Sequence, residues 1–284
     1  MKVSVIIPCH NESAHLAEQL DALAAQHHDG AWDVIVVDHR STDRTAEVAS
    51  AHVPLRDRLQ VVRVDDGHNV ARARRAGVEA SDADAFLFCD GDDVVAPGWL
   101  AGLVAAMQEA PLATGLVDTA RLNPPALARS RGRGRGGAAP TFAGHPFVSG
   151  CNVAVRRDAW ESLHGFDEAF GGLEDIEFSL RAIVAGIPVR YVPDAVVYYR
   201  YRSTARALWR QASYYGASGP LLARRCVELG LTPPPRWAGL RSWAWLVAYL
   251  PIAWTPQHRI RWWWTLGSRI GSLRGAVLAR RFQV

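Results

Sequence analysis

This sequence contains few cysteines and no long apolar run. Its 284 residues include four cysteines and no CxxC pair, and the first apolar stretch stops at Pro8, too early for a signal peptide. These absences predict a reduced, cytoplasmic compartment. The longest uncharged apolar run, residues 243–255, covers 13 positions and includes Pro251, whereas a membrane-spanning helix needs about 20. We therefore expect no segment that crosses a bilayer.

The composition is typical of a folded protein with a large core. With 49% hydrophobic residues, the chain can form one large α/β domain, alone or with a helical appendage, and it is too apolar to be disordered. The net charge of +4 and the pI near 9.1 suit an anionic partner, but the arginines are concentrated in particular segments. We predict no nucleic-acid partner.

Short hydrophobic runs alternate with segments of helical spacing in the first half of the chain. The runs cover positions 3–7, 34–37, 59–64 and 85–89 and are rich in β-branched and aromatic residues. The segments between them carry apolar stripes, formed by Leu16, Leu20, Leu23 and Ala24, by Ala46 and Ala49, and by Val70, Ala73 and Val78. This order predicts an α/β fold with a Rossmann-like, mostly parallel central sheet and helices on both faces.

The expected strands end in polar segments, and ligands bind beyond the carboxyl ends of strands in such sheets. These ends read PCHNES, DHRSTD, DDGHN and CDGDD. A further strand is expected at 112–117, followed by a mobile basic loop at 119–146 that is rich in Pro, Gly and Arg. Beyond the loop we expect a helix in EDIEFSLRAIVAG, paired extended runs in PVRYV and AVVYYRYR, and helices from residue 203 onward.

The segment CDGDD places three carboxylates directly after an apolar strand. Side chains alternate along an extended backbone, so Asp90 and Asp92 point the same way if the strand continues that far. Two like charges in this position repel each other unless a cation joins them. The alternative is that these aspartates only cap the turn before Pro97.

Six segments occur in the order found in a known family. They read SVIIPCHNE, VIVVDHRSTDRT, NVARARRAGV, FCDGDDVVAPGWL, SGCNVAVRRDAW and GFDEAFGGLEDIEFSLRAIVAGIPVRYVP, and they cover roughly residues 3–200. In these segments the chain resembles a family 2 glycosyltransferase. The resemblance implies a GT-A fold and transfer of a sugar, with inversion, from a nucleotide-diphosphate sugar to an acceptor hydroxyl. It also implies a divalent metal, Mn²⁺ or Mg²⁺.

The resemblance suggests a division of the chain into two parts. The catalytic domain would cover residues 1–202, with a nucleotide-binding half at 1–118, the basic loop at 119–146 and an acceptor half with the catalytic base at 147–202. A helical region would follow at 203–284.

The donor site implied by the resemblance combines three strand ends with one arginine. Its residues are Pro8, His10, Asn11, Glu12, Asp38, Arg74, Asp90, Gly91 and Asp92. Asp92 is the expected metal ligand, and Asp90 is expected at the metal as well, near the ribose or a metal-bound water. Asp93 is expected to cap the following turn.

Several donor-side residues have a second possible role. Asn11 or Ser13 is also expected to cap the first helix. Arg74 is expected to pair with a donor phosphate, with Asp90 or with Asp38.

Two positions depart from the family pattern. Relatives commonly carry a second aspartate after the one matched by Asp38, where this chain has His39, so the donor base stays open. Many relatives also have a histidine near the metal after the last strand. Here Tyr199 takes its place, and Arg200 or Arg202 is expected to meet phosphate instead.

A second carboxylate cluster lies in the segment GLEDIEFSLR. A sugar hydroxyl is a poor nucleophile and needs a base that takes its proton as the new bond forms. The resemblance implies that Asp175 is this base and that Glu174 helps to position it or the acceptor, while Glu177 is expected at the surface or in an ion pair. The acceptor side of the sugar pocket is expected to include Gly150, Cys151 and Asn152.

One nucleotide-binding motif is a false positive. GRGRGG, residues 132–137, matches the dinucleotide pattern GxGxxG, but it follows no strand and opens no helix. The arginines around it bind either an anionic group or only solvent, and they are Arg129, Arg131, Arg133 and Arg135.

The C-terminal region is rich in tryptophan and arginine. Seven of the eleven tryptophans lie between Trp237 and Trp264, interleaved with Arg236, Arg241, Arg259 and Arg261. Both residue types suit the headgroup layer of a membrane, because each has an apolar body and a polar end. We expect either peripheral attachment to the inner face of the cell membrane, near a glycan or lipid-linked acceptor, or packing on the catalytic domain or on a second subunit in a homodimer.

Two other functions fit part of the pattern. A sugar-phosphate nucleotidyltransferase would share the fold type and the carboxylates, but it would need a Gly-rich basic phosphate loop after the first strand, and PCHNES has neither glycine nor lysine. A non-catalytic nucleotide-sugar or glycan-binding relative would have no need for two intact carboxylate clusters.

Overall fold

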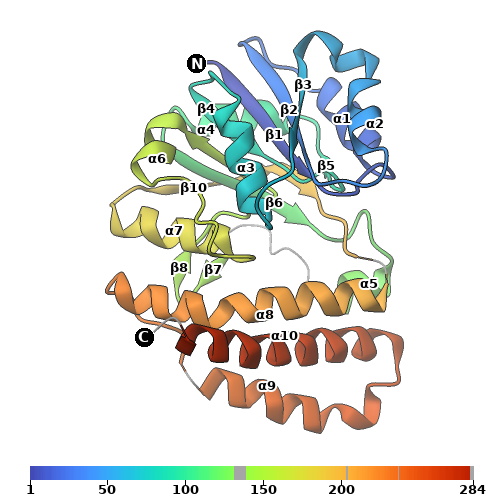
Figure 1. Ribbon diagram of the computed structural model, residues 1–284, viewed down its shortest axis with the longest axis vertical. Coiled ribbons are helices and arrows are strands. Elements are labelled where there is room, and N and C mark those ends of the chain that lie inside the picture. The colour runs from blue at the N-terminus through green and yellow to red at the C-terminus, as the bar shows by residue number, and fades with distance from the viewer. Residues whose placement is uncertain (131–138, 203, 236, 282–284) are drawn as a thin grey trace. The chain divides into compact units, whose positions relative to one another are not determined.

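The computed structural model describes residues 1–130, 139–202, 204–235 and 237–281 and confirms the predicted α/β fold (Figure 1). The chain forms two compact units. We call Met1–Asp118, Gly134–Glu168 and Glu174–Tyr199 the sheet unit, and Thr119–Arg133, Ala169–Leu173 and Arg200–Val284 the helical unit.

An eight-stranded sheet forms the centre of the sheet unit, in the order β3-β2-β1-β4-β9-β6-β10-β5. Its strands are β1 (Val3–Cys9), β2 (Trp32–His39), β3 (Leu59–Val64), β4 (Ala85–Phe88), β5 (Val94–Val95), β6 (Leu112–Asp118), β9 (Val153–Arg156) and β10 (Val189–Tyr198). Strands β1 to β4 are parallel, whereas β9 runs antiparallel between β4 and β6, and β5 is antiparallel to β10. The first four strands are those predicted from the sequence.

Helices cover both faces of this sheet. Because side chains alternate along β1, Val5 and Ile7 enter one core and Ile6 enters the other. The first core includes side chains of α1 (Leu16–Ala24), α2 (Thr45–Ser50), η1 (Val53–Arg58) and α4 (Trp99–Ala106). The second includes side chains of α3 (Val70–Glu79), α6 (Arg157–Ser162) and α7 (Glu174–Val184). Burial on two faces explains why the strands read as continuous hydrophobic runs.

The two extended runs expected at the end of the acceptor half are in fact one strand. β10 pairs in parallel with β6 along both runs, and its register shifts between Val192 and Val196. Pro193 and Asp194 lie in this interval. Proline has no N–H to donate to a neighbouring strand and is found at bulges, so the segment that suggested a turn between two strands is an irregularity within one.

The segment expected as a loop, residues 119–146, contains regular structure. It includes α5 (Pro125–Ser130) and a hairpin of β7 (Thr141–Phe142) and β8 (His145–Pro146). Ala143 and Gly144 form the turn of the hairpin with φ values of 50° and 86°. Three of the four loop arginines, Arg131, Arg133 and Arg135, lie outside the described residues.

Three helices form the predicted C-terminal helical region: α8 (Ala205–Glu228), α9 (Trp237–Ala248) and α10 (Pro256–Arg281), with a short turn η2 (Leu250–Ile252) between the last two. Figure 1 shows α10 between α8 and α9. Glycines allow α8 and α10 to approach closely, because a Cβ on Gly271 would lie 2.1 Å from a backbone oxygen of Ser213, and one on Gly216 would lie 2.1 Å from that of Ser268. Among the described helices, none has the length and apolar character needed to cross a membrane.

Candidate active site

The ends of β1 and β2 are joined by side chains that hold the following loops together. Asn11 has φ 59°, and its backbone N–H donates to the Ser41 hydroxyl at 3.0 Å, while its side-chain oxygen accepts from the Thr42 N–H at 2.8 Å. The Glu12 N–H donates to the Thr45 hydroxyl at 2.9 Å. The structure therefore brings the predicted donor-site residues Asn11 and Glu12 next to the segment that follows β2.

The expectation that Asn11 or Ser13 caps the first helix is wrong. Helix α1 begins after His15, with no side-chain cap. Asn11 is already used in the loop contact with Thr42, and the Ser13 N–H donates to Asp43 at 3.0 Å.

Histidines connect the ends of β1, β2 and β3. His10 Nδ1 lies 2.8 Å from the His39 carbonyl oxygen, and His39 Nε2 lies 2.9 Å from the Asp66 carbonyl oxygen. His39 is buried. The residue that stands in place of a common family aspartate therefore holds the strand ends in position.

Asp38, one of the predicted donor-site residues, lies near the end of β2. It is 2% exposed, and its Oδ1 is buried with no hydrogen-bond partner among the described residues. Buried polar atoms usually have partners, because desolvation without a hydrogen bond is costly. Pro8 lies one position earlier in the register, opposite Val37.

Arg74 of α3 joins the two carboxylate clusters. Its Nη2 donates to Asp90 Oδ1 at 3.0 Å and its Nη1 to Glu174 Oε1 at 2.5 Å. The guanidinium is 3% exposed. Burial lowers the pKa of Arg74, but Asp90, Glu174 and Asp175 together raise it above the ordinary value, so the side chain stays charged. Of the three partners that the sequence suggested for Arg74, the structure shows Asp90.

Glu174 and Asp175 begin α7. Burial raises the pKa of Glu174 to about 7, while the Arg74 charge opposes this rise. Asp175 accepts from the Gly150 N–H at 2.8 Å through Oδ2 and from the Ile176 N–H at 2.8 Å through Oδ1. Burial also raises the pKa of Asp175, against the lowering effect of the Gly150 N–H.

Glycines let the backbone approach these side chains closely. A Cβ on Gly150 would lie 2.9 Å from Arg74 Nη1, and one on Gly91 would lie 2.7 Å from Cys9 Sγ. Both positions therefore need glycine in order to keep the present geometry.

One group of described side chains could hold a metal ion, and it contains Asp90, which the sequence suggested as a ligand. Ligand atoms of Asp90, Asp93 and Cys151 lie within 4.8 Å of one another. Asp93 is fully buried, and Asp92 is 7% exposed. Burial raises the pKa of the Cys9 thiol, and the charges of Glu12 and Asp92 raise it further.

The other predicted sugar-pocket residue, Asn152, is fully buried and held by the protein. Its Nδ2 donates to the Leu116 and Ala195 carbonyl oxygens at 3.0 and 2.9 Å, and its Oδ1 accepts from Trp99 Nε1 at 2.9 Å. These contacts connect β6, β10 and α4. Sequence reasoning did not identify this bracing role, because the partners come from distant segments.

Comparison with known proteins identifies the family of this chain. Residues 4–163, more than half of the chain, match Glycosyl transferase family 2, and residues 85–274 match Glycosyl transferase family group 2. The chain belongs to glycosyltransferase family 2. This confirms the family that the six sequence segments indicated.

Individual relatives of this family 2 glycosyltransferase are distant. The pre-mycofactocin glycosyltransferase of Mycobacterium tuberculosis is 27% identical over 235 residues, which cover 78% of this chain and 48% of the relative. The chain spans about half the length of the first curated relatives it matches.

Solved structures confirm the GT-A fold. The mannosyltransferase PcManGT from Pyrobaculum calidifontis, in complex with GDP-Man and Mn²⁺, has a TM-score of 0.65 and 19% identity, and the match covers 95% of this chain and 86% of that one. S. aureus TarS 1–349 in complex with UDP-GlcNAc has a TM-score of 0.57 and 18% identity, with coverage of 100% and 93%.

Two further positions in the sheet unit complete the comparison with the sequence. Glu177 is fully buried and forms an ion pair with Arg181 at 2.7 Å, so the ion-pair alternative is confirmed and the surface alternative is wrong. Tyr199 follows β10, where its N–H donates to the Asp118 carbonyl at 2.8 Å. Arg200 and Arg202 belong to the helical unit.

Proposed function

We propose that this chain is an inverting, metal-dependent glycosyltransferase that moves a sugar from a nucleoside diphosphate onto a hydroxyl group of a glycan or a lipid-linked saccharide. Asp175 acts as the general base. The observation that carries this proposal is the Arg74 bridge, because it brings the donor-side carboxylate Asp90 and the helix start with Glu174 and Asp175 into one buried site.

The geometry at Asp175 suits a base that must be ionised. Each of its oxygens accepts one backbone N–H and keeps lone pairs for a further hydrogen bond. The acceptor hydroxyl donates its proton to this carboxylate as its oxygen attacks the anomeric carbon. The bond from that carbon to the diphosphate breaks at the same time, so a single displacement inverts the configuration. Glu174 contacts Arg74, and its role is to position this guanidinium beside Asp90.

Donor binding is assigned to the strand ends. Asp38 offers a buried, unpartnered oxygen to a nucleobase, and the loop of His10, Asn11 and Glu12 lies next to it at the end of β1. Fold neighbours were solved with UDP-GlcNAc and with GDP-Man, so both nucleotides are candidates for the donor.

The donor side also fits a divalent cation. Mg²⁺ and Mn²⁺ favour carboxylate oxygens, and Asp90 and Asp93 would hold the ion, with Asp92 as a further candidate. Cys151 also lies close to Asp90 and Asp93, but it is a poor ligand for these ions, because burial raises the pKa of its thiol. A bound cation would neutralise the charge that develops on the leaving diphosphate.

The direct test measures the melting temperature of the whole chain with UDP, GDP, dTDP and CDP, each with and without Mn²⁺. A ligand at about a hundred times its dissociation constant adds roughly 2.7 kcal/mol, which at this size raises the midpoint by about 5–10 °C. We expect one nucleotide to act, and to act only with the metal. The absence of any shift would contradict the proposal and favour a non-catalytic relative that binds a glycan.

A further inference from the structure

The charges of the chain are divided unevenly along the sequence. Glu228 is the last acidic residue, so residues 229–284 contain eight of the 32 basic residues and none of the 28 acidic ones. Residues 1–228 carry the remaining 24 basic residues and all 28 acidic ones. The positive net charge therefore comes entirely from the segment that holds α9, η2 and α10. Such a segment attracts a negatively charged surface.

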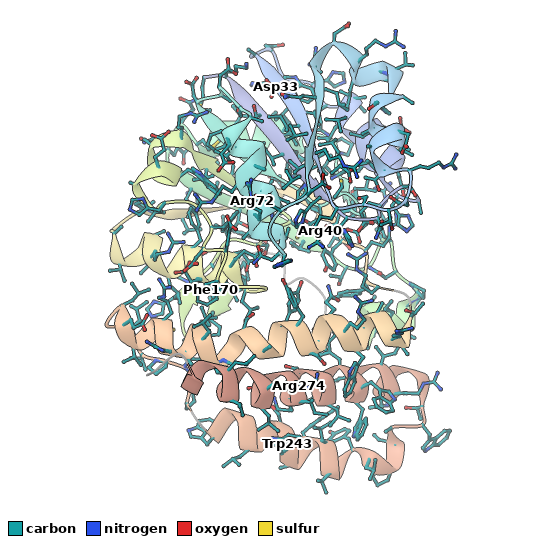
Figure 2. All side chains as sticks on the ribbon, viewed as in Figure 1. Asp33, Arg40, Arg72, Phe170, Trp243 and Arg274 are labelled. Atoms are coloured by element: carbon teal, nitrogen blue, oxygen red, sulfur yellow. The ribbon has the colours of Figure 1, made fainter. Side chains whose placement is uncertain are left out.

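Helix α9 and the turn η2 expose a stripe of large apolar side chains. It consists of Leu240, Trp243 and Val247, which follow helical spacing on α9, together with Leu250 of η2 and Trp254 just after it. Val247 is 74% exposed and Trp254 is 76% exposed. Figure 2 shows Trp243 on α9, with Arg274 on the adjacent α10. The opposite side of α9 packs on α10, where Leu246 is buried and its carbonyl accepts from Trp262 Nε1 at 2.9 Å.

Next to this stripe, α9 and α10 form a pocket of about 400 Å³. It is lined by Trp237, Arg241, Ser242, Trp245, Arg261 and Thr265. Each arginine lies over an aromatic ring, Arg241 at 5.4 Å from the centroid of Trp237 and Arg261 at 4.9 Å from that of Trp245. The two guanidinium groups, each oriented by an aromatic ring, provide donors that suit a phosphate group.

We propose that α9, η2 and the first turns of α10 form a binding surface for a bilayer that contains anionic phospholipids. The apolar stripe enters the boundary between headgroups and acyl chains, and a headgroup phosphate lies between Arg241 and Arg261. Tryptophan and arginine suit this boundary, since each places an apolar body in the lipid and a polar end at the water.

The same observations argue against a second copy of the chain as the occupant. In a two-fold dimer the same patch faces itself, so this surface would bring arginines against arginines. Residues 229–284 contain no acidic side chain that could pair with them. Arg241, Arg259 and Arg261 are all exposed. Arg236, which the sequence placed in the same group, lies outside the described residues.

Flotation of the whole chain with phosphatidylcholine vesicles, with and without phosphatidylglycerol, tests the proposal. We expect flotation only with the anionic vesicles at low salt, and its loss at high salt because the attraction is screened. Val247→Asp places a charge in the stripe and abolishes flotation. Arg241→Gln combined with Arg261→Gln weakens partitioning into the vesicles by about tenfold to thirtyfold, because each arginine near an anionic membrane surface strengthens binding by about threefold to fivefold.

Matched controls separate this surface from general effects of charge. Val53→Asp alters a valine of the sheet unit that is also exposed, and Arg190→Gln removes an exposed arginine there, so both variants should float like the native chain. Melting temperatures confirm that each variant is folded.

Three results would overturn the proposal. The first is failure of the native chain to float at low salt. The second is stabilisation by inorganic phosphate through Arg241 and Arg261 without flotation, which would make the pocket a site for a soluble anion. The third is a dimer in the absence of vesicles that Val247→Asp dissociates. These outcomes do not depend on the proposed sugar transfer, which the nucleotide experiment tests separately.

Discussion

Replacement of Arg74 by methionine tests the buried charge network. The guanidinium is 3% exposed and lies between Asp90 and Glu174, and the Glu174 side chain is 6% exposed. Methionine keeps much of the volume but leaves both carboxylates without this cation. Breaking a buried ion pair costs about 3–5 kcal/mol, because the remaining charge is uncompensated. Since each kcal/mol lowers the midpoint of a chain of this size by about 2–4 °C, the melting temperature should fall by about 6–20 °C.

The stability lost in Arg74→Met should depend on pH, because it depends on the ionisation of Glu174. Burial already raises its pKa to about 7, and Arg74 opposes that rise, so Arg74→Met moves the pKa higher still. The folded variant then keeps a proton at a pH where the unfolded chain, with a glutamate pKa near 4.3, has released it. Stability of the variant is therefore lost as the pH rises, and the two proteins should differ most above about pH 7 and converge below it.

Thermal unfolding across this pH range measures the effect, and two further variants sharpen it. Adding Glu174→Gln to Arg74→Met removes the uncompensated charge and should restore part of the lost stability. Arg72→Met is the matched control on the same helix, because Arg72 pairs with the exposed residues Asp66 and Glu79 and such pairs contribute about 0–1 kcal/mol. Equal losses in the Arg72 and Arg74 variants, or a difference that does not change with pH, would refute the reasoning.

Further predictions concern the base, the metal and the helical unit. Asp175→Asn should lower kcat by a factor of about 10²–10⁴ while leaving the nucleotide-induced melting shift intact. The rate of the native enzyme should decrease as the pH falls, and this decrease should begin at a higher pH than for an ordinary aspartate, because burial raises the pKa of Asp175. Asp93→Asn should abolish the Mn²⁺ dependence of nucleotide binding more completely than Asp92→Asn, as a titration with Mn²⁺ can show; the reverse order would restore Asp92 as the main ligand. Gly271→Ala should lower the melting temperature, because its Cβ would overlap a backbone oxygen of α8.

The parts of the fold that the sequence predicted depend on local patterns. Strands β1 to β4 are buried on both faces, so each reads as a continuous apolar run, and the polar residues after each run mark the edge of the sheet where the candidate site lies. The sequence predicts two extended runs in place of β10, and this error also has a local cause. Pro193 and Asp194 are typical turn residues, and only the pairing with β6 shows that they form a bulge.

The connections within the site depend on distant segments and were only partly predictable. Arg74 is 16 residues from Asp90 and 100 residues from Glu174. The sequence suggested the first partner, but it gave no sign of the second. The choice between Asp92 and Asp93 shows the same limit. Alternation along a strand groups Asp90 with Asp92 only if the strand continues, but β4 ends at Phe88. In the turn that follows, a ligand atom of Asp93 lies within 4.8 Å of one of Asp90, which the alternation did not indicate.

Regularly spaced glycines in the helical unit are visible in the sequence, and the structure shows what they do. Gly267, Gly271 and Gly275 recur every four residues and therefore lie on one face of α10, which packs closely on α8. The tryptophans and arginines suggested either a membrane surface or internal packing, and the composition could not separate the two. The glycine face determines how α10 packs, because this side of the helix contacts α8. Helix α9 then packs on another part of α10 with its Leu246 side, and the apolar stripe around Val247 stays exposed.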